Sequence, residues 1–202
     1  MSKFVDRCRT NYDNYLRRGE LMNFKNMIKT IFSVYRFLDK IAYSIDKIVE
    51  TRALNACYMY LDNTAFNDVV NVSNDIMELT QRKITLINLK VLATSMIKNL
   101  DKNYARLIIM KYIENKPYAE IGKLLNISER TVTRWHSNAV VSSYFYLENQ
   151  GYTLIKLLEM LKKERWILQT FYSFSQNKEN QDTENANMIK HACKEYKKVL
   201  CK

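Results

Sequence analysis

The residues of this chain that could do chemistry gather in the stretch ISERTVTRWHSNAV, residues 127–140. Spacings of three and four place Val132, Trp135 and Ala139 on one apolar face of a helix. The opposite face carries hydrogen-bond donors and acceptors, namely Ser128, Glu129, Arg130, Thr133, Arg134 and Ser137. Such groups bind base edges and phosphates when a helix lies in the major groove of DNA. The pattern therefore predicts a DNA-reading helix.

The residues before this helix have the types that a helix-turn-helix needs. Ile121 and Leu125, four apart, supply the inner face of a first short helix. Gly122 lets the two helices approach closely, at a cost of about 1 kcal/mol in helix propensity against alanine. Asn126 tolerates the positive φ that the turn requires, and Ser128 is a favoured N-cap for the second helix. Together these residues predict a helix-turn-helix over residues 118–140.

An excess of basic residues, 32 Lys and Arg against 21 Asp and Glu, gives the chain a formal net charge of +11. This excess favours a polyanionic partner, either nucleic acid or an anionic membrane surface. Five basic residues are expected to add non-specific attraction to phosphates. They are Lys102, Arg106, Lys111, Lys116 and Lys123. We assign Lys116 and Lys123 to the DNA-binding site, together with the six polar residues of the second helix.

Other kinds of site lack the residues that they need. The four cysteines and two histidines have no zinc-site spacing, and three scattered glycines cannot build a phosphate-binding loop. The carboxylate pairs Glu159/Glu164 and Asp182/Glu184 are expected on a helix surface and in a polar segment, with no histidine to make an acid–base pair. We expect His136 to be exposed or to contact a phosphate or the backbone. The sequence therefore predicts no enzyme activity, no metal and no cofactor.

The beginning of the chain has no secretory pattern, because Met1 to Glu20 carries charges throughout. No run of 18 apolar residues occurs, so we expect no membrane span. The even number of cysteines leaves disulfides open by arithmetic. Reduced thiols in a cytoplasmic protein are the simpler interpretation.

Three glycines and one proline in 202 residues favour an all-α chain. The first 20 residues form a short helix or a basic arm in this interpretation, and a long apolar stripe then runs from Asn23 to about Leu61. Asp62 to Asn74 reads as a loop that ends with Ser73 as an N-cap. The next helix reaches Leu100, and Asp101 caps a third. Pro117 ends that helix and begins the first helix of the helix-turn-helix.

The last quarter of the chain is also predicted to be mainly helical. Gly151 has the position of a helix stop, and a further helix should follow it. For the uncharged piece Trp166 to Phe174, periodicity alone fits a strand as well as a helix. Ser175 to Asn187 is expected to be a flexible polar tether, with a short basic helix after it. We divide the chain into a helical region at 1–74, a DNA-binding domain at 75–150, and a helical extension at 151–202 with its tether at 175–187.

The stretch YARLIIMKYIENKPYAEIGKLLNISERTVTRWHSNAV resembles the conserved region 4 helix-turn-helix of bacterial sigma-70-type factors. The matching motifs are KYIE at 111–114, YAEIG at 118–122, LNIS at 125–128 and TV at 131–132. Two long helices upstream, the second carrying RKITLINLKVLATSMIKNL, make the layout similar to the phage-type, sigma-like regulators of Gram-positive bacteria (the ArpU and RinA type). The resemblance implies DNA binding and contact with RNA polymerase.

Two parts of the chain depart from a full sigma factor. No region 2, which would melt promoter DNA, is evident. Its candidate aromatics are Tyr12, Tyr15, Phe32, Tyr35 and Phe37, interleaved with Arg17, Arg18 and Arg36. Most of them fall on the packing stripe, so we expect core positions. The extension after Gly151 lies outside the resemblance.

The sequence thus predicts an all-α, sequence-specific transcription regulator of the phage or prophage activator type, acting on double-stranded DNA with RNA polymerase. The long N-terminal helices would form a homodimer or dock another partner, and no membrane is expected to take part. Three alternatives stay open. They are a divergent but complete sigma factor, a small terminase-like DNA-packaging adaptor, and a module that binds only proteins.

Overall fold

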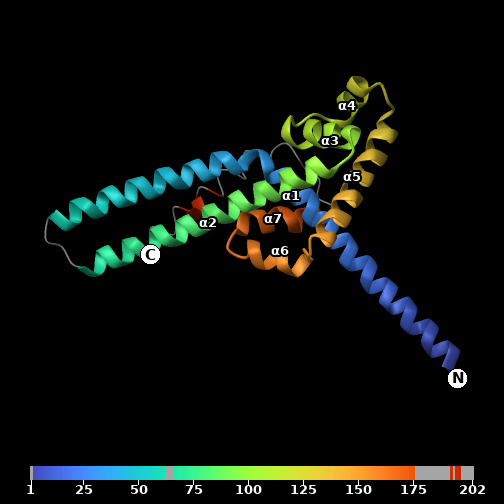
Figure 1. Ribbon diagram of the computed structural model, residues 1–202, viewed down its shortest axis with the longest axis horizontal. Coiled ribbons are helices and arrows are strands. Elements are labelled where there is room, and N and C mark those ends of the chain that lie inside the picture. Colours follow the sequence, from blue (N-terminus) through green and yellow to red (C-terminus); the bar gives the residue numbers. More distant parts are fainter. Residues whose placement is uncertain (1, 62–65, 176–191, 193, 197–202) are drawn as a thin grey trace.

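The computed structural model describes the backbone of residues 2–61, 66–175, 192 and 194–196, and the side chains from residue 21 to 58 and from 70 onward within those ranges. Every element within these ranges is helical, as predicted (Figure 1). An antiparallel hairpin of two long helices is followed by a group of short helices and one longer helix, and two further short helices near the C-terminus pack against the hairpin. No helix in the described ranges is long and apolar enough to cross a membrane.

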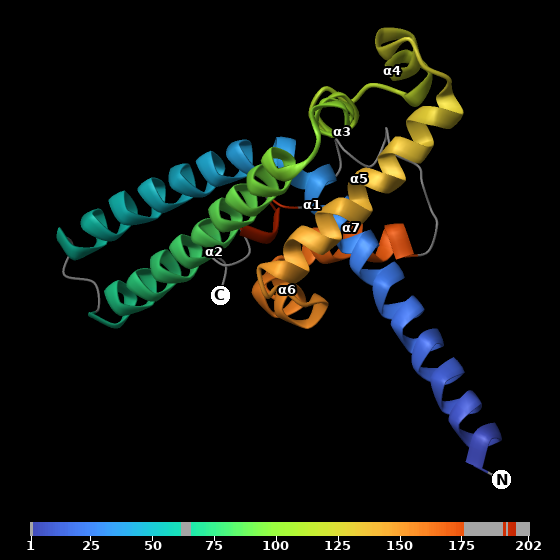
Figure 2. The ribbon, with the colours of Figure 1, turned by 45° about the vertical axis from the view of Figure 1, so that its right-hand side comes forward.

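The hairpin consists of α1 (Ser2–Leu61) and α2 (Phe66–Asn99). The predicted apolar stripe of α1 is its packing face, since Ile28, Ile31 and Ile41 are fully buried. Two lysines of α2 hold the register: Lys83 binds Asp46 and Lys90 binds Asp39, each at 2.6 Å. The two ion pairs are seven residues apart on each helix and run in opposite directions, as expected for antiparallel helices. The N-terminal end of α1 extends away from the rest of the fold in both views (Figures 1 and 2).

The predicted loop before α2 is shorter than expected. Residues 62–65 lie outside the described residues, but α2 already begins at Phe66, so residues 66–74 are helical and the loop prediction is wrong there. Ser73 lies inside α2 and is not its N-cap. Polar residues in this stretch misled the prediction because a helix tolerates Asn, Ser and Asp on a solvated face. Asn71, Ser73 and Asn74 are all exposed.

The short helices follow α2 directly. They are α3 (Lys102–Ile108), the π-helix η1 (Ile109–Ile113) and α4 (Tyr118–Leu125), and the longer α5 (Glu129–Asn149) comes after them. Asp101 occupies the N-cap position of α3, although its side chain makes no capping hydrogen bond. The π-turn was not predicted. Pro117 is the extended residue immediately before α4, as predicted.

The C-terminal part supplies α6 (Leu154–Leu161) and α7 (Arg165–Ser175). Gly151 has a φ of +73° at the end of α5, which confirms the helix stop. The stretch Trp166 to Phe174 is helical, so the predicted helix is confirmed and the strand that periodicity left open is excluded. Its side chains explain this, because Trp166, Ile167 and Phe171 are buried on one helical face against α1. Most of the predicted tether and C-terminal helix lies outside the described residues, but Ala192 and residues 194–196 are helical.

One hydrophobic core joins the hairpin to the short helices. Phe32 and Phe37 are buried in it, which confirms the expectation for those two aromatic residues. Tyr35 is half-buried, and its hydroxyl lies 3.3 Å from Thr94 of α2. Phe24 of α1 meets Tyr144 of α5 edge to face, with ring centroids 5.1 Å apart. The second half of α5 is thus fixed on the hairpin, while its first half leads away from it (Figure 2).

Candidate nucleic-acid interface

Helices α4 and α5 cross closely at Gly122, as predicted. A Cβ placed on Gly122 would lie 2.9 Å from the carbonyl oxygen of Ile127 and 3.7 Å from the Cγ2 atom of Val132. The first contact is with backbone, which cannot rotate away as a side chain can. Ile121 and Val132 are fully buried on the inner sides of the two helices. The glycine therefore allows the turn to fold back over α4.

The turn between the helices has the predicted chemistry. Asn126 adopts the left-handed conformation, with φ 54° and ψ 45°, and the N–H of Ile127 donates to the carbonyl of Gly122. Ser128 is the N-cap of α5, since its hydroxyl accepts a hydrogen bond from the N–H of Thr131 at 3.2 Å. Glu129 then lies in the first turn of α5, where the helix dipole favours an acid. The turn thus sets the direction in which α5 begins.

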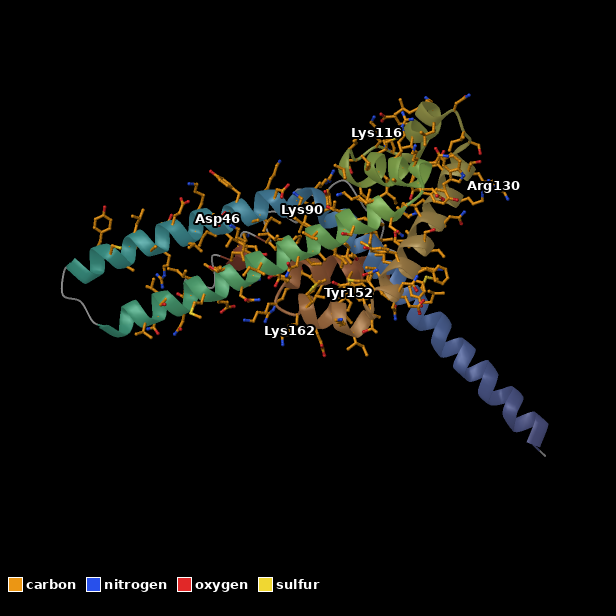
Figure 3. All side chains as sticks on the ribbon, viewed as in Figure 1. Asp46, Lys90, Lys116, Arg130, Tyr152 and Lys162 are labelled. Atoms are coloured by element: carbon orange, nitrogen blue, oxygen red, sulfur yellow. The ribbon has the colours of Figure 1, made fainter. Side chains whose placement is uncertain are left out.

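The six polar residues predicted for α5 share one exposed surface, which we call the recognition face. All of them are exposed: Ser128, Glu129, Arg130, Thr133, Arg134 and Ser137. Arg130 and Arg134 are four apart, so their side chains are neighbours along the helix. No ion pair joins either arginine to a carboxylate within the described residues. Figure 3 shows Arg130 directed outward near the start of α5.

The hydroxyl groups of the recognition face are already engaged. Thr133 donates to the carbonyl of Glu129 and Ser137 donates to the carbonyl of Thr133, both at 3.1 Å. The Ser128 hydroxyl lies 2.9 Å from that of Thr131. Each oxygen retains acceptor capacity, but the protons of Thr133 and Ser137 would have to leave a backbone carbonyl before they could be donated to a base. The two guanidinium groups are therefore the most available donors of this face.

His136 lies on the buried side of α5, opposite the recognition face. The expectation that it is exposed is therefore wrong. His136 is only 7% exposed, and its Nε2 atom lies 2.8 Å from the hydroxyl of Tyr112. The ring of Tyr118 approaches it from α4, with centroids 5.7 Å apart. Burial lowers the pKa of His136 to about 4, and the charges of Lys29 and Lys111 act in the same direction. His136 is therefore a neutral core residue that joins α5 to η1 and α4.

Trp135 and Tyr104 form a second contact beneath the recognition face, between α5 and α3. Trp135 is half-buried and meets Tyr104 of α3 edge to face, with centroids 6.0 Å apart. The Tyr104 hydroxyl accepts a hydrogen bond from the side-chain amide of Asn138 at 3.3 Å. Sequence reasoning placed Trp135 correctly but missed Tyr104, Tyr112 and His136. Their pairing joins separate helices, and no local pattern signals it.

The basic residues around the recognition face differ in availability. Lys123 of α4 and Lys102 and Arg106 of α3 are exposed. Lys116 lies 3.0 Å from Glu114 and 3.8 Å from Glu120, so two carboxylates already offset its charge. Lys111 is half-buried, and its ammonium lies 4.6 Å from the centroid of the Tyr118 ring. Lys123 is thus the better placed of the two lysines assigned to the site.

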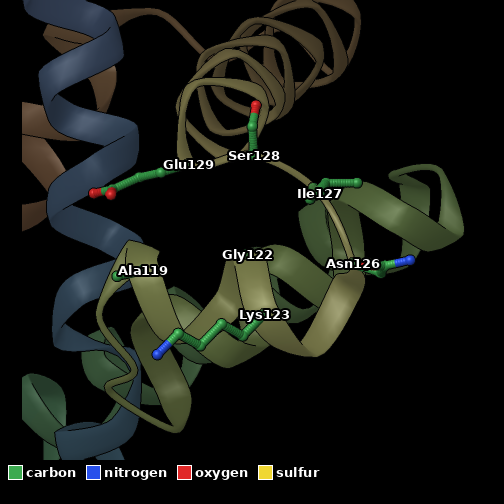
Figure 4. Close-up of a pocket in the computed structure, with 7 residues that line it drawn as sticks. All are labelled: Ala119, Gly122, Lys123, Asn126, Ile127, Ser128 and Glu129. Atoms are coloured by element: carbon green, nitrogen blue, oxygen red, sulfur yellow. The ribbon is translucent and has the colours of Figure 1, made fainter.

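An open hollow lies between α4 and α5 (Figure 4). It is lined by Ala119, Gly122, Lys123, Asn126, Ile127, Ser128 and Glu129. Sites for small organic ligands are mostly enclosed and lined by apolar and aromatic side chains. This hollow is open to solvent, and it is lined by polar and apolar atoms in similar measure. It is the groove of the helix-turn-helix itself, with Lys123 on one side and Glu129 on the other.

A second polar cluster lies far from this corner and is completely buried. Glu164, expected on a helix surface, is only 1% exposed. Its carboxylate accepts hydrogen bonds from Nε of Arg82 at 3.0 Å, from Nε1 of Trp166 at 3.1 Å and from the hydroxyl of Tyr196 at 2.6 Å. Burial and the Glu164 carboxylate raise the pKa of the Tyr196 phenol well above its usual value, so it remains a donor. The prediction of a surface position for Glu164 is wrong.

The geometry of α4, the turn and α5 defines a DNA-binding helix-turn-helix. Residues 91–141 match the family model described as Sigma-70, region 4, over a segment from the last turns of α2 to the middle of α5. This segment, about a quarter of the chain, is therefore similar to the DNA-binding region 4 of sigma-70 factors. Comparisons with curated proteins and with solved structures gave no match.

Proposed function

We propose that the protein is a sequence-specific transcription regulator that reads duplex DNA with the recognition face of α5. One observation carries the proposal. Arg130 and Arg134 stand exposed on one face, without a carboxylate partner within the described residues, while the opposite side of the same helix is buried. Arginine is the side chain that most often reads guanine in the major groove. Thr133, Ser137 and Glu129 would complete the contacts to base edges.

Contacts to phosphates would come from the flanks of the recognition face. Lys123 lies across the hollow from Ser128 and Glu129, and the N-cap of α5 presents backbone N–H groups at the same edge. Helix N-termini and lysines both favour phosphate oxygens. Lys116 belongs to the same proposed site but would have to exchange its two carboxylate partners for phosphate.

The proposed regulator is a phage- or prophage-type activator that works in the cytoplasm with RNA polymerase. The region 4 match and the layout of two long helices before it support this assignment. The burial of Phe32 and Phe37 favours a regulator over a complete sigma factor, because buried rings cannot stack on unpaired bases. The α1–α2 hairpin would serve as the site of association with a partner.

The recognition face is tested by removing its two arginines and comparing the result with a control variant that loses the same charge elsewhere. Duplexes selected by the protein from a random pool serve as the probe. Arg130→Ala with Arg134→Ala should weaken binding to the selected sequence by about 1–3 kcal/mol for each arginine, which is the usual value of a bidentate base contact. Fluorescence anisotropy at fixed salt measures the loss.

The matched control is Lys162→Ala with Lys163→Ala, which removes the same charge at the far side of the fold. Lys162 is exposed, and Figure 3 shows it well away from Arg130. The control should lose little affinity. Equal losses in both double variants would mean that overall charge, and not the recognition face, attracts DNA. Unchanged binding in both would mean that another surface binds DNA. Failure to select any duplex from the pool would favour a module that binds only proteins.

The role with RNA polymerase has a separate test. Transcription from a selected site is measured with core polymerase, with and without the housekeeping sigma factor. An activator requires that sigma factor, because it does not itself melt the promoter. Initiation by core polymerase and this protein alone would show a complete sigma factor instead.

A further inference from the structure

The outward side of α2 differs in composition from the rest of the molecule. The exposed residues of α2 between positions 70 and 91 form what we call the α2 outer face. They are Val70, Asn71, Ser73, Asn74, Met77, Thr80, Gln81, Ile84, Ile87, Asn88 and Val91. None of them carries a charge, although 26% of the residues of the chain are charged. Charged residues are the ones depleted at the centres of protein interfaces.

The charges of this part of α2 are turned away from the outer face. All five form ion pairs with the neighbouring helices or the segment after α6. Arg52 binds Asp75 at 2.9 Å, Asp46 binds Lys83, Asp39 binds Lys90, Glu164 binds Arg82, and Lys163 lies 4.0 Å from Glu78. Both edges of the outer face are therefore bordered by opposite charges in pairs, so the face and its surroundings are close to neutral.

The apolar residues of the outer face recur with the period of a coiled coil. Val70, Met77, Ile84 and Val91 are seven residues apart, and Ile87 lies one turn after Ile84. They are 44% to 67% exposed. Coiled coils have two apolar positions in each seven-residue repeat. The α2 outer face has one of them throughout and the second only at Ile87, since Ser73 and Thr80 stand at the equivalent places. Over 22 residues of α2 the repeat extends about 30 Å.

The outer face of α1 lacks both properties. Its exposed positions include Asp39, Lys40, Lys47 and Glu50. Its large exposed apolar residues, such as Tyr43 and Leu54, lie among these charges. The two helices of one hairpin therefore present different surfaces, and only α2 presents a neutral stripe.

We propose that the α2 outer face binds the same face of a second copy of this chain, forming a two-fold dimer. The composition of the face supports this partner. Two copies, each at +11, repel one another, and the electrostatic cost of their contact is smallest where the touching surfaces carry no charge, which is the case for the α2 outer face. A two-fold interface uses the same patch on both copies, which a charge-free stripe permits. DNA is an unsuitable partner because this face has no cation. This inference specifies the association suggested for the hairpin and does not depend on DNA binding.

The dimer leaves both recognition faces free. The beginning of α5, which carries the recognition face, lies away from the hairpin in both views, so a contact along residues 70–91 of α2 does not cover that face (Figures 1 and 2). Helix-turn-helix dimers read two half-sites related by the two-fold axis of the protein. The selected DNA should accordingly contain an inverted repeat.

The mass of the intact protein in solution tests the proposal. Sedimentation velocity over a concentration series up to about 100 µM should give twice the 24.1 kDa of one chain, since a Kd of about 1 µM leaves little monomer there. Met77→Glu with Ile84→Glu places four like charges in the dimer seam and should give a single chain. Circular dichroism confirms that the variant keeps its helices.

The matched control is Tyr43→Glu with Leu54→Glu, two exposed apolar residues on α1 of the same hairpin. This variant should remain a dimer. A photo-reactive residue at position 84, but not at 54, should cross-link two copies. A wild-type mass of one chain overturns the proposal, and so does a dimer that survives the α2 variant. Either result leaves the arginine test of DNA binding unaffected, so the two proposals fail separately.

Discussion

Arginine has opposite roles in two regions of this molecule. Arg82 is 6% exposed, and its guanidinium donates to Glu164 and to the carbonyl of Lys163 while it stacks on the Tyr196 ring at 4.4 Å. Arg130 and Arg134 are exposed and have no ion-pair partner within the described residues. In the first region a carboxylate of the same chain neutralises the guanidinium. In the second region the guanidinium groups remain available to a ligand from outside the chain.

The buried and the exposed arginines should affect different properties of the protein, namely its stability and its affinity for DNA. Removing one partner of a buried ion pair leaves an uncompensated charge in a poorly solvated place, which is costly. An exposed charge is solvated with or without a partner, so its removal hardly changes folding. We therefore expect the buried cluster to govern the free energy of unfolding and the recognition face to govern affinity for DNA.

The largest expected effect is on the buried side. Glu164→Ala should lower the free energy of unfolding by about 3–5 kcal/mol, because Arg82 loses its buried carboxylate. Urea denaturation followed by circular dichroism measures the change. Glu159→Ala is the control, since Glu159 is exposed on α6 and should change stability by less than about 0.5 kcal/mol. Equal stability of the two variants would contradict the assigned role of the cluster.

The burial of His136 beneath the recognition face should make the stability of the protein depend on pH. The pKa of His136 is about 4 in the folded protein and 6.5 ordinarily, so between these pH values only the unfolded state takes up the proton. The stabilisation is complete above pH 6.5 and should be lost as the pH falls toward 4, by about 3 kcal/mol from this group. Urea midpoints across this pH range measure it.

The control for that measurement is His136→Gln, whose amide can still accept from Tyr112 but does not titrate. Carboxylates contribute a pH dependence to both proteins, so the difference between the two curves isolates the histidine. Identical curves would mean that His136 is not held in its neutral form.

The smallest expected effect distinguishes two lysines beside the recognition face. Lys123→Ala should reduce the slope of log affinity against log salt by about one, as loss of one phosphate contact does. Lys116→Ala should change the slope less, because Glu114 and Glu120 already hold that ammonium. Anisotropy titrations at several salt concentrations compare the two. A larger change for Lys116 would show that its ion pairs yield to DNA.

The features that the sequence predicted correctly depend on residues close together in the chain. The corner at Gly122, Asn126 and Ser128 was predicted in detail, because each residue answers a local requirement of backbone geometry or capping. The exposure of Arg130 and Arg134 followed from periodicity within one helix. These features depend on residues within a few positions of one another.

The missed features depend on residues far apart in the chain. Glu164 and Arg82 are 82 residues apart and meet only after α6 and α7 pack on the hairpin, so nothing near Glu164 signals its burial. His136 and Tyr112 likewise come from different helices. The start of α2 was placed too late because polar residues on a solvated helix face resemble those of a loop.

The length of α5 has a mechanical consequence. One uninterrupted helix, about 30 Å long, carries Arg130 near one end and the buried Leu147 near the other. Its C-terminal half packs on α1 and α2, so the helix connects the hairpin directly to the recognition face. A partner that shifted the hairpin would therefore also shift Arg130 and Arg134, without contacting them.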